Sequence, residues 1–265
     1  MEYLLMYTEG ADPQPWDPAD DNIAEWVQEM IDRRVSEYGE RLRPAEDATI
    51  VRVRDGKVLL TEGPFTEAKE WVGGFDIISC ADLDEAVEIA SRHPATRQGT
   101  TEVRPFMVWP DADPDSQIVP LGFPERPTHG KRYLMLVCVD PSGEKGVSDE
   151  VDPWVSTWDA AGVRLFGEVL RPPADGTLVR TRQGKVLVTD GPYSEAKEWI
   201  AGLDFIEVRD FDQAVEVAAG HPMARSGLIA LVPVWSFDVH ADHVARAAVE
   251  ADEFGHRTEP RVGVA

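Results

Sequence analysis

Hydrophobic and polar positions follow one another in an order that the chain uses twice. Residues 57–94 read KVLLTEGPFTEAKEWVGGFDIISCADLDEAVEIASRHP, and residues 185–222 read KVLVTDGPYSEAKEWIAGLDFIEVRDFDQAVEVAAGHP. The offset is 128 residues (185 − 57) without a gap, and 22 of the 38 positions are identical. An internal repeat of this length predicts two copies of one structural unit.

The first copy opens with an apolar run over residues 3–7 that predicts a buried strand. A helix is expected next, with Asp17 as its N-cap, Pro18 at the first helical position and an end near Gly39. Its apolar positions recur at helical spacing, at Ile23, Trp26, Val27, Met30, Ile31 and Val35. The remaining expected elements are a hairpin of strands 49–54 and 57–61 around Asp55-Gly56, a strand over 75–80, a helix with a capping box at Asp82 and Glu85, and a strand over 103–109.

The second copy predicts the same order. It has strands over residues 133–139 and 228–235, a Gln183-Gly184 turn in place of Asp-Gly, and a helix cap at Asp210 and Gln213. Its first helix is expected to be short, over about residues 154–161, because Pro153 fits only a helix start.

The segment between the copies predicts a semi-rigid connection, since residues 110–130 contain five prolines. We therefore expect one domain over residues 1–110, a linker over 111–130, a second domain over 131–236 and a C-terminal tail over 237–265. A short helix is expected in the tail near residues 241–251.

Each copy thus reads strand, helix, hairpin, strand, helix, strand, which predicts a ferredoxin-like α+β unit with an added strand. In such a unit helices cover one face of the sheet and leave the other face apolar. Two tandem copies can cover these faces with each other, as an internal pseudo-dimer of the dimeric α+β barrel type.

Composition and charge narrow the classes of function. The net charge of −23 argues against nucleic acid or an anionic membrane as a partner, because phosphate binding needs an excess of Lys and Arg. The acidity favours solubility, with an acidic face for a basic protein partner as the alternative. No apolar stretch is long enough for a membrane span, and the start of the chain does not have the pattern of a signal peptide. Cys80 and Cys138 form no metal-binding spacing, so a cytoplasmic location is expected.

The segment from Glu62 to Trp71, matched by Asp190 to Trp199, is the candidate for chemistry. Its acid-Gly-Pro turn and a helix cap at the following Thr or Ser are ordinary turn chemistry. Lysine is less easily explained, because the chain has six lysines and four fall at matched positions, namely Lys57, Lys69, Lys185 and Lys197. Either Lys69 and Lys197 pair with neighbouring glutamates as inherited features, or each supplies a compact ammonium to a site.

His93 and His221 are the matched histidines, each followed by proline at a helix end. Such a residue either caps helix carbonyls or transfers a proton near neutral pH. His240 and His243 lack a third ligand, so no metal site is expected. Trp71, Trp109, Trp199 and Trp235 are expected in the core rather than at a cofactor. No phosphate loop, nucleophile elbow or dinucleotide fingerprint is present, and no cofactor is expected.

These residues carry a family resemblance. The run acid-Gly-Pro-aromatic-x-Glu-x-Lys-Glu, followed by Gly-aromatic-x-Ile and Asp-x-Asp-x-Ala, resembles the DGPF domain of YCII-related proteins. Glu62 replaces the aspartate of the name-giving tetrapeptide in the first copy, and Tyr193 replaces its phenylalanine in the second. The resemblance implies a ferredoxin-like dimeric α+β barrel, an enzymatic role built on a His–Asp pair in a pocket, and an association with extracytoplasmic-function sigma factors. Outside the repeated motif the sequence offers no counterpart of that His–Asp pair.

Two hypotheses follow. In the first, each copy holds a small anionic or carbonyl-containing molecule on Lys69 or Lys197, and a histidine moves a proton in a cofactor-free reaction. The candidate catalytic residues are Lys69, His93, Glu62, Lys197, His221 and Asp190, and the candidate binding residues are Phe65, Glu70, Trp71, Tyr193, Glu198 and Trp199. In the second, the protein is a non-catalytic module whose acidic surface binds a basic regulator such as a sigma factor.

Overall fold

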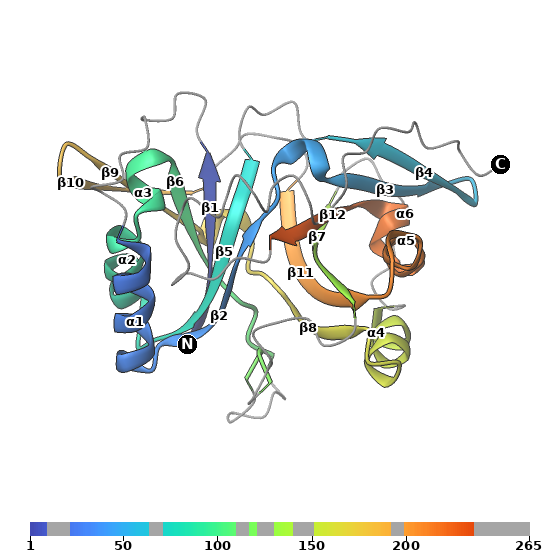
Figure 1. The fold of residues 1–265 in the computed structure, drawn as a ribbon, viewed down its shortest axis with the longest axis horizontal. Coiled ribbons are helices and arrows are strands. Elements are labelled where there is room, and N and C mark those ends of the chain that lie inside the picture. The colour runs from blue at the N-terminus through green and yellow to red at the C-terminus, as the bar shows by residue number, and fades with distance from the viewer. Residues whose placement is uncertain are drawn as a thin grey trace. The chain divides into compact units, whose positions relative to one another are not determined.

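The fold is seen in a computed structural model, which describes residues 1–9, 22–63, 71–109, 117–120, 130–139, 151–191 and 199–235 (Figure 1). The elements of the first copy are β1 (Glu2–Glu9), α1 (Ile23–Arg33), β2 (Ser36–Leu42), η2 (Ala45–Asp47), β3 (Thr49–Arg54), β4 (Lys57–Glu62), β5 (Trp71–Ser79), α2 (Leu83–Arg92), α3 (Ala95–Gln98) and β6 (Thr100–Pro105). Those of the second copy are β7 (Lys131–Val139), α4 (Val151–Ala160), β8 (Arg164–Val169), η4 (Pro173–Asp175), β9 (Thr177–Arg182), β10 (Lys185–Asp190), β11 (Trp199–Val208), α5 (Phe211–Gly220), α6 (Met223–Ser226) and β12 (Gly227–Trp235). The two copies therefore share one order of elements. In the part of the chain described, no helix is long and apolar enough to cross a membrane.

The local sequence signals for helix starts and tight turns are confirmed. Asp82 accepts a hydrogen bond from the Glu85 amide at 3.0 Å, and Asp210 accepts one from the Gln213 amide at 2.9 Å. These side chains satisfy donors that would otherwise be unpaired in the first turns of α2 and α5. Both hairpin turns have positive φ at their two central residues, Asp55 and Gly56 at 52° and 72° and Gln183 and Gly184 at the same values. This is the geometry of a type I′ turn.

The first helix is shorter than the sequence predicts. α1 ends at Arg33 because Arg34 adopts a left-handed conformation (φ 57°), and the amides of Arg34 and Val35 turn back onto the carbonyls of Ile31 and Met30. The chain then enters β2, a strand missing from the prediction, and its counterpart in the second copy is β8. The expected cap at Asp17 and Pro18 lies outside the described residues.

The last strand of the first copy also differs from the expectation. β6 occupies Thr100–Pro105 rather than residues 103–109, and Trp109 beyond it is 50% exposed. Trp109 is therefore not a core residue, whereas Trp71 and Trp235 are buried.

All paired strands are antiparallel, and each copy contributes four neighbouring strands to the sheet. The orders are β6-β1-β5-β2 and β12-β7-β11-β8. β3 continues from the edge of the second group by pairing with β12, and β9 pairs in the same way with β6 of the first group. The registers are related by the 128-residue offset, since Ile229 is opposite Val51 and Thr101 is opposite Val179. Each hairpin is thus bound to the sheet of the other copy.

Three apolar clusters lie on the two faces of these strands. In the first copy, Tyr3, Leu5 and Ile78 face Trp26 and Met30 of α1 and residues of α2, which cover one side of the sheet in Figure 1. The second copy repeats this layer with α4, α5 and α6. The opposite strand faces contribute to a shared cluster, in which Phe75 lies 6.0 Å from Phe205 between ring centroids. Because strand side chains alternate between faces, this arrangement also decides which way Asp76 points.

Candidate acid–base site

Asp76 is a carboxylate inside an otherwise apolar strand. Its neighbours Phe75 and Ile77 belong to the shared cluster, so Asp76 points to the opposite face, with Ile78, toward α1 and α2. Across the sheet it is opposite Leu5 on one side and Gly39 on the other. A Cβ on residue 39 would lie 1.9 Å from Asp76 Oδ1, so the carboxylate occupies space that only glycine leaves open.

Three aromatic rings join this carboxylate to the end of α2. The Tyr7 hydroxyl donates a hydrogen bond of 2.6 Å to Asp76 Oδ2. The Tyr7 ring stacks on His93 with 3.9 Å between centroids and 12° between planes, and Trp26 meets the same imidazole edge-on at 4.7 Å. Tyr7, Trp26 and His93 are all buried, whereas Asp76 is partly exposed. Asp76 is therefore the one of these four residues that is not fully enclosed by the protein.

His93 is held as a neutral ring with a defined tautomer. It is the residue that ends α2, and its Nδ1 accepts a hydrogen bond of 3.1 Å from the Ala95 amide at the start of α3. Since Nδ1 is an acceptor, the ring proton resides on Nε2. Burial, with a smaller contribution from the charge of Arg97, lowers the pKa of His93 to about 3. At neutral pH this side chain offers an N–H donor rather than a base.

Asp76 has the opposite shift. Burial raises the pKa of Asp76 to about 7, and the hydrogen bond from Tyr7 partly opposes this rise. The pKa of Tyr7 is in turn raised well above its usual value, first by burial and then by the charge of Asp76. The phenol therefore keeps its proton. Both protonation states of Asp76 are populated near neutral pH, which is the property required of a general acid or base.

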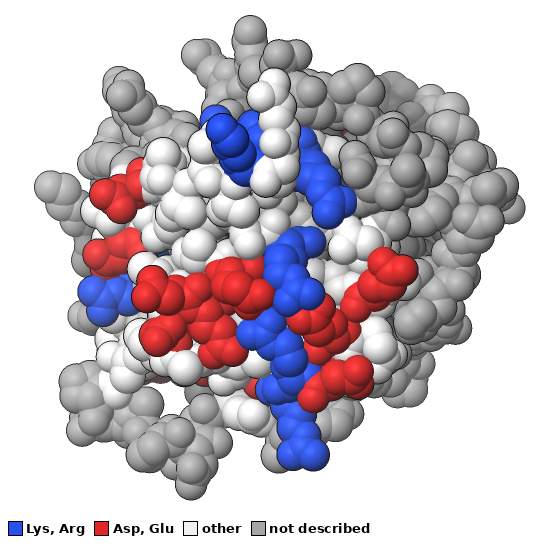
Figure 2. Space-filling model, turned by 90° about the vertical axis from the view of Figure 1, so that its left-hand side faces the viewer, with Lys and Arg blue, Asp and Glu red and all other residues white. Residues whose placement is uncertain are grey.

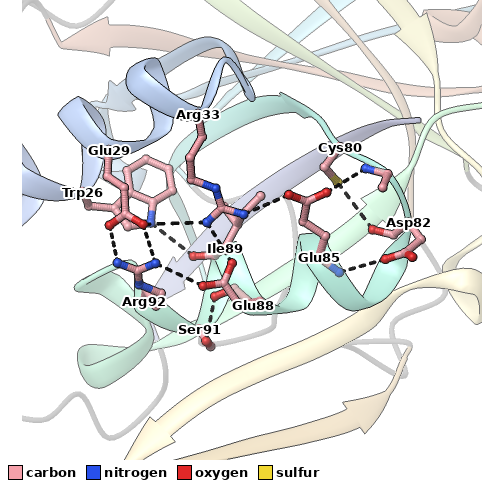
Figure 3. A network of polar contacts seen from close by, with 11 residues as sticks. Trp26, Glu29, Arg33, Cys80, Asp82, Glu85, Glu88, Ile89, Ser91 and Arg92 are labelled. Carbon is pink, nitrogen blue, oxygen red and sulfur yellow. Dashed lines mark hydrogen bonds and ion pairs between the residues drawn. The ribbon is translucent and has the colours of Figure 1, made fainter.

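An ion-pair network joins α1 and α2 around Trp26 (Figure 3). Trp26 Nε1 donates 3.1 Å to the Ile89 carbonyl of α2. Around this bond, Arg33 pairs with Glu85 and Glu88, each at 2.9 Å, and Arg92 pairs with Glu29 and with Glu88. Exposed ion pairs of this kind each contribute little to folding stability. Together they connect α1 and α2 at several points around Trp26.

The second copy supports the His93 turn from outside. The Arg182 guanidinium, at the tip of β9, donates to the carbonyls of Thr96, Arg97 and Gly99 at 2.9–3.1 Å. Thr181 donates 3.3 Å to the Ser91 carbonyl, just before the histidine. Arg54 makes the reciprocal contacts to Ala224, Arg225 and Gly227. Each histidine turn is therefore stabilised by the hairpin of the other copy.

The second copy contains the same constellation with one exchange. Asp204 and His221 are both buried, with 3.8 Å between Asp204 Oδ2 and His221 Nε2. The Met223 amide donates to His221 Nδ1, Trp154 meets the imidazole edge-on at 4.5 Å, and its Nε1 donates to the Val217 carbonyl. The contacts of Met223 and Trp154 match those of Ala95 and Trp26 in the first copy at an offset of 128.

The two copies differ in the side chain that contacts the carboxylate. Tyr7 is opposite Gly74 in the first copy, and the residue opposite the matching Gly202 is Val137. Arg164 supplies the missing contact, since its Nε donates 2.6 Å to Asp204 Oδ1. In the first copy, the position of Arg164 is occupied by Ser36. Burial raises the pKa of Asp204, and the charge of Arg164 opposes this. The pKa of His221 is lowered to about 3 by burial and by Arg164.

Four of the residues proposed as catalytic lie within the described residues, namely Glu62, His93, Asp190 and His221, and the two histidines belong to these clusters. They do so as acceptors of backbone amides rather than as caps of carbonyls. Glu62 and Asp190 are exposed at the ends of β4 and β10, and their side chains make no hydrogen bond or ion pair with the described residues. Trp71 is buried in the shared cluster and Trp199 is half-buried on β11. The other candidates, together with His240 and His243, lie outside the described residues: Phe65, Lys69, Glu70, Tyr193, Lys197 and Glu198.

The sequence interpretation missed Asp76 and Asp204, although a signal was present. Both are charged residues within apolar strands, and both are identical within the repeat. A matched charge inside an apolar run indicates a buried polar site. Trp26 and Trp154 carry a second signal, since they match at the same offset. The described residues hold no group of three or more His, Cys, Asp or Glu side chains that suits a metal ion.

This fold defines a tandem α+β protein that carries one Asp–His constellation in each copy. The model of the YCII-related domain matches residues 1–110 and again 136–238, and the chain belongs to this family. An uncharacterized protein of Rhizobium meliloti is 31% identical over 115 residues, which are 40% of this chain and 91% of that protein. Among solved structures, a putative chlorite dismutase aligns over 89% of this chain and 94% of its own, with 9% identity and a TM-score of 0.38.

Proposed function

We propose that the first copy is a cofactor-independent acid–base site for a small molecule, with Asp76 as the group that gains and loses the proton. The observation that carries this proposal is a partly exposed carboxyl group with a pKa of about 7, fixed by Tyr7 beside a neutral histidine. The reaction class is proton transfer of the isomerase or lyase type at a carbon next to a carbonyl group.

In this proposal the histidine does not move the proton. A ring with a pKa of about 3 is a weak base, and its Nδ1 is already engaged by Ala95. His93 instead packs against the Tyr7 ring and, being neutral, adds no positive charge beside Asp76. Lys69 remains a proposed contact for an anionic or carbonyl group of the same ligand.

The second copy is proposed to be structural. Arg164 satisfies Asp204 and fills the side from which a ligand would approach, and both partners are nearly buried, at 12% and 7% side-chain exposure. The chain would then keep one active and one inactive copy.

Solvent isotope exchange tests the proposed function. The protein is incubated in D2O with a panel of small 2-oxo acids, lactones and amino ketones, and loss of carbon-bound protons is followed by 1H NMR. Wild-type protein and the matched control Asp204→Asn are expected to catalyse exchange on at least one compound, and Asp76→Asn is expected to be inactive. Exchange that is equal in Asp76→Asn and wild type, or absent throughout, would overturn the proposal.

We also infer that the two copies form an internal pseudo-dimer. The inference is supported by the reciprocal pairing of β3 with β12 and of β9 with β6, and by the bridges Leu42–Val234 and Phe106–Leu170, which match at an offset of 128. If it is right, residues 1–110 and 131–236 produced as separate chains should associate on mixing. Two halves that each remain monomeric and folded would contradict it.

A second candidate function is a regulatory role through a basic protein partner such as a sigma factor. It is favoured by the acidic face of α1 and α2, whose helices contain Glu25, Glu29, Asp32, Asp84, Glu85 and Glu88 against Arg33 and Arg92 (Figure 2). This role predicts binding to a sigma factor that is lost when salt rises from about 50 to 500 mM, since surface charges are screened over that range. Binding unaffected by salt, or no binding at low salt, would remove this candidate.

A further inference from the structure

The carboxylates of the two copies occupy equivalent positions, but different groups contact them. Asp76 is opposite Leu5 and Gly39, and Asp204 is opposite Met135 and Gly167. A Cβ on Gly39 would lie 1.9 Å from Asp76 Oδ1, and one on Gly167 would lie 2.3 Å from Asp204 Oδ1. The Oδ1 atom therefore rests against the backbone of the neighbouring strand in both copies.

In the second copy this oxygen is covered by a guanidinium group of the chain itself. Arg164 Nε donates to Asp204 Oδ1 at 2.6 Å, and its Nη2 donates to the Gly167 carbonyl at 2.8 Å. Its Nη1 lies 3.1 Å from Asp159 of α4. A carboxylate and a backbone carbonyl thus form a two-point acceptor for a cationic N–H group.

The first copy has the same acceptors without the arginine. Ser36 stands in place of Arg164 and is too short to reach across the strand, while Tyr7 occupies only Oδ2. No described residue donates a hydrogen bond to Asp76 Oδ1, and Asp76 is partly exposed where Asp204 is 5% exposed. The oxygen that Arg164 covers in the second copy is therefore open in the first.

We propose that Asp76 Oδ1 and the Gly39 carbonyl bind the guanidinium or protonated amine of a small ligand, in the position that Arg164 occupies in the second copy. This rests on the site of the proposed function and names the class of its ligand. The hydrogen bonds of the Arg164 guanidinium to Asp204 and Gly167 show the geometry in which such a cation would bind.

The residue at the position equivalent to Asp159 indicates what kind of group the ligand carries next to its cation. The residue that corresponds to Asp159 is Ile31, which is 51% exposed on α1. The carboxylate that pairs with Arg164 Nη1 in the second copy is thus replaced by an apolar side chain, which favours a ligand whose cationic group is joined to an apolar body. Arg97 does not oppose this, because its counterpart Arg225 coexists with Arg164 in the second copy.

The charged and titratable groups around Asp76 determine how binding is detected. Tyr7 reaches it from β1, His93 stands at the end of α2, and both are neutral at physiological pH. A bound cation is then the main new charge beside the carboxylate. An opposite charge within about 4–6 Å lowers the pKa of a carboxyl group by about 1–3.

The experiment uses methylguanidinium chloride as the probe and follows the Asp76 carboxyl carbon of 13C-aspartate-labelled full-length protein by NMR, with KCl at equal ionic strength as the control. The pKa of Asp76 is expected to fall by about one or more with the probe, and that of Asp204 to stay unchanged. In Arg164→Ser, Asp204 should become responsive as well. A pKa of Asp76 that does not respond, or that rises, would overturn the proposal.

This outcome is separable from the fate of the proposed function. If the probe leaves Asp76 unaffected while deuterium exchange still depends on Asp76, the acid–base role stands and the cationic ligand class is wrong. If the probe lowers the pKa of Asp76 while Asp76→Asn retains full exchange activity, the binding site stands and the catalytic role fails.

Discussion

The carboxylate of Asp76 occupies the space in which any side chain at Gly39 would begin. A Cβ would meet Asp76 Oδ1 at 1.9 Å and Cγ at 2.7 Å, which belong to a movable side chain, and the Phe75 carbonyl only at 3.2 Å. At the matched Gly167 a Cβ would also meet the Leu203 carbonyl at 2.6 Å, which belongs to the backbone. A side chain at this glycine position should therefore be tolerated better in the first copy than in the second.

Gly39→Ala is expected to turn Asp76 away from β2 and to break its bond with Tyr7, at a cost of about 1–3 kcal/mol of unfolding free energy. Gly167→Ala should cost more, because a backbone carbonyl cannot turn aside. Urea unfolding of both variants checks this order. Gly220→Ala is the control, since its nearest neighbour would be 3.7 Å away and alanine favours a helix. Equal losses in Gly39→Ala and Gly167→Ala would contradict the interpretation.

Tyr7→Phe isolates the hydrogen bond to Asp76. The phenol stabilises the ionised carboxylate, so its removal is expected to raise the pKa of Asp76 above about 7. The loss of stability should be about 1 kcal/mol, typical of one hydrogen bond. Titration of the Asp76 carboxyl carbon by NMR measures the pKa. Tyr3→Phe, whose hydroxyl contacts Met1 rather than a carboxylate, is the control and should leave Asp76 unchanged.

The raised pKa of Asp76 also predicts how stability depends on pH. Its folded pKa of about 7 lies above the ordinary value of 3.8, so between these values the folded state binds more protons than the unfolded state. This contribution to stability is fully present below about pH 4 and is lost as pH rises through 7. Asp76→Asn should therefore gain stability relative to wild type on going from pH 5 to pH 8. Chemical denaturation at both pH values measures the difference, and a constant difference would contradict it.

Arg164→Met tests the buried ion pair of the second copy. The variant leaves the buried Asp204 carboxylate without its cationic partner. Removing one partner of a buried ion pair lowers the free energy of unfolding by about 3–5 kcal/mol. Ser36→Ala, the matched change in the first copy, is expected to cost less than about 0.5 kcal/mol. Urea unfolding compares the two. A loss below about 1 kcal/mol in Arg164→Met would mean that the pair contributes little.

Local signals predicted much of the fold. The repeat, the caps at Asp82 and Asp210 and the two type I′ turns depend on neighbouring residues, and the sequence displays them directly. β2 was missed because its strand SEYGERL buries only Tyr38 and Leu42, so its polar residues resemble the end of a helix. The left-handed Arg34 that stops α1 has no sequence signature comparable to a glycine.

The site was harder to predict, because its contacts join distant parts of the chain. Tyr7 and Asp76 are 69 residues apart, and Arg164 and Asp204 are 40 apart. The histidines were found because they match between the copies, and the aspartates match equally well. An ionisable residue inside an apolar strand must have a partner, and this rule points to Asp76 and Asp204 independently of the motif lysines.

Because each hairpin packs on the other copy, the structure of each half of the chain depends on the other half. Arg182, encoded in the second half, holds the turn that follows His93 in the first, and Arg54 does the reverse. A substitution in one copy can therefore impair the histidine turn of the other. Deletion of either copy should for this reason destabilise the turn that remains, whether or not the deleted copy binds a ligand of its own.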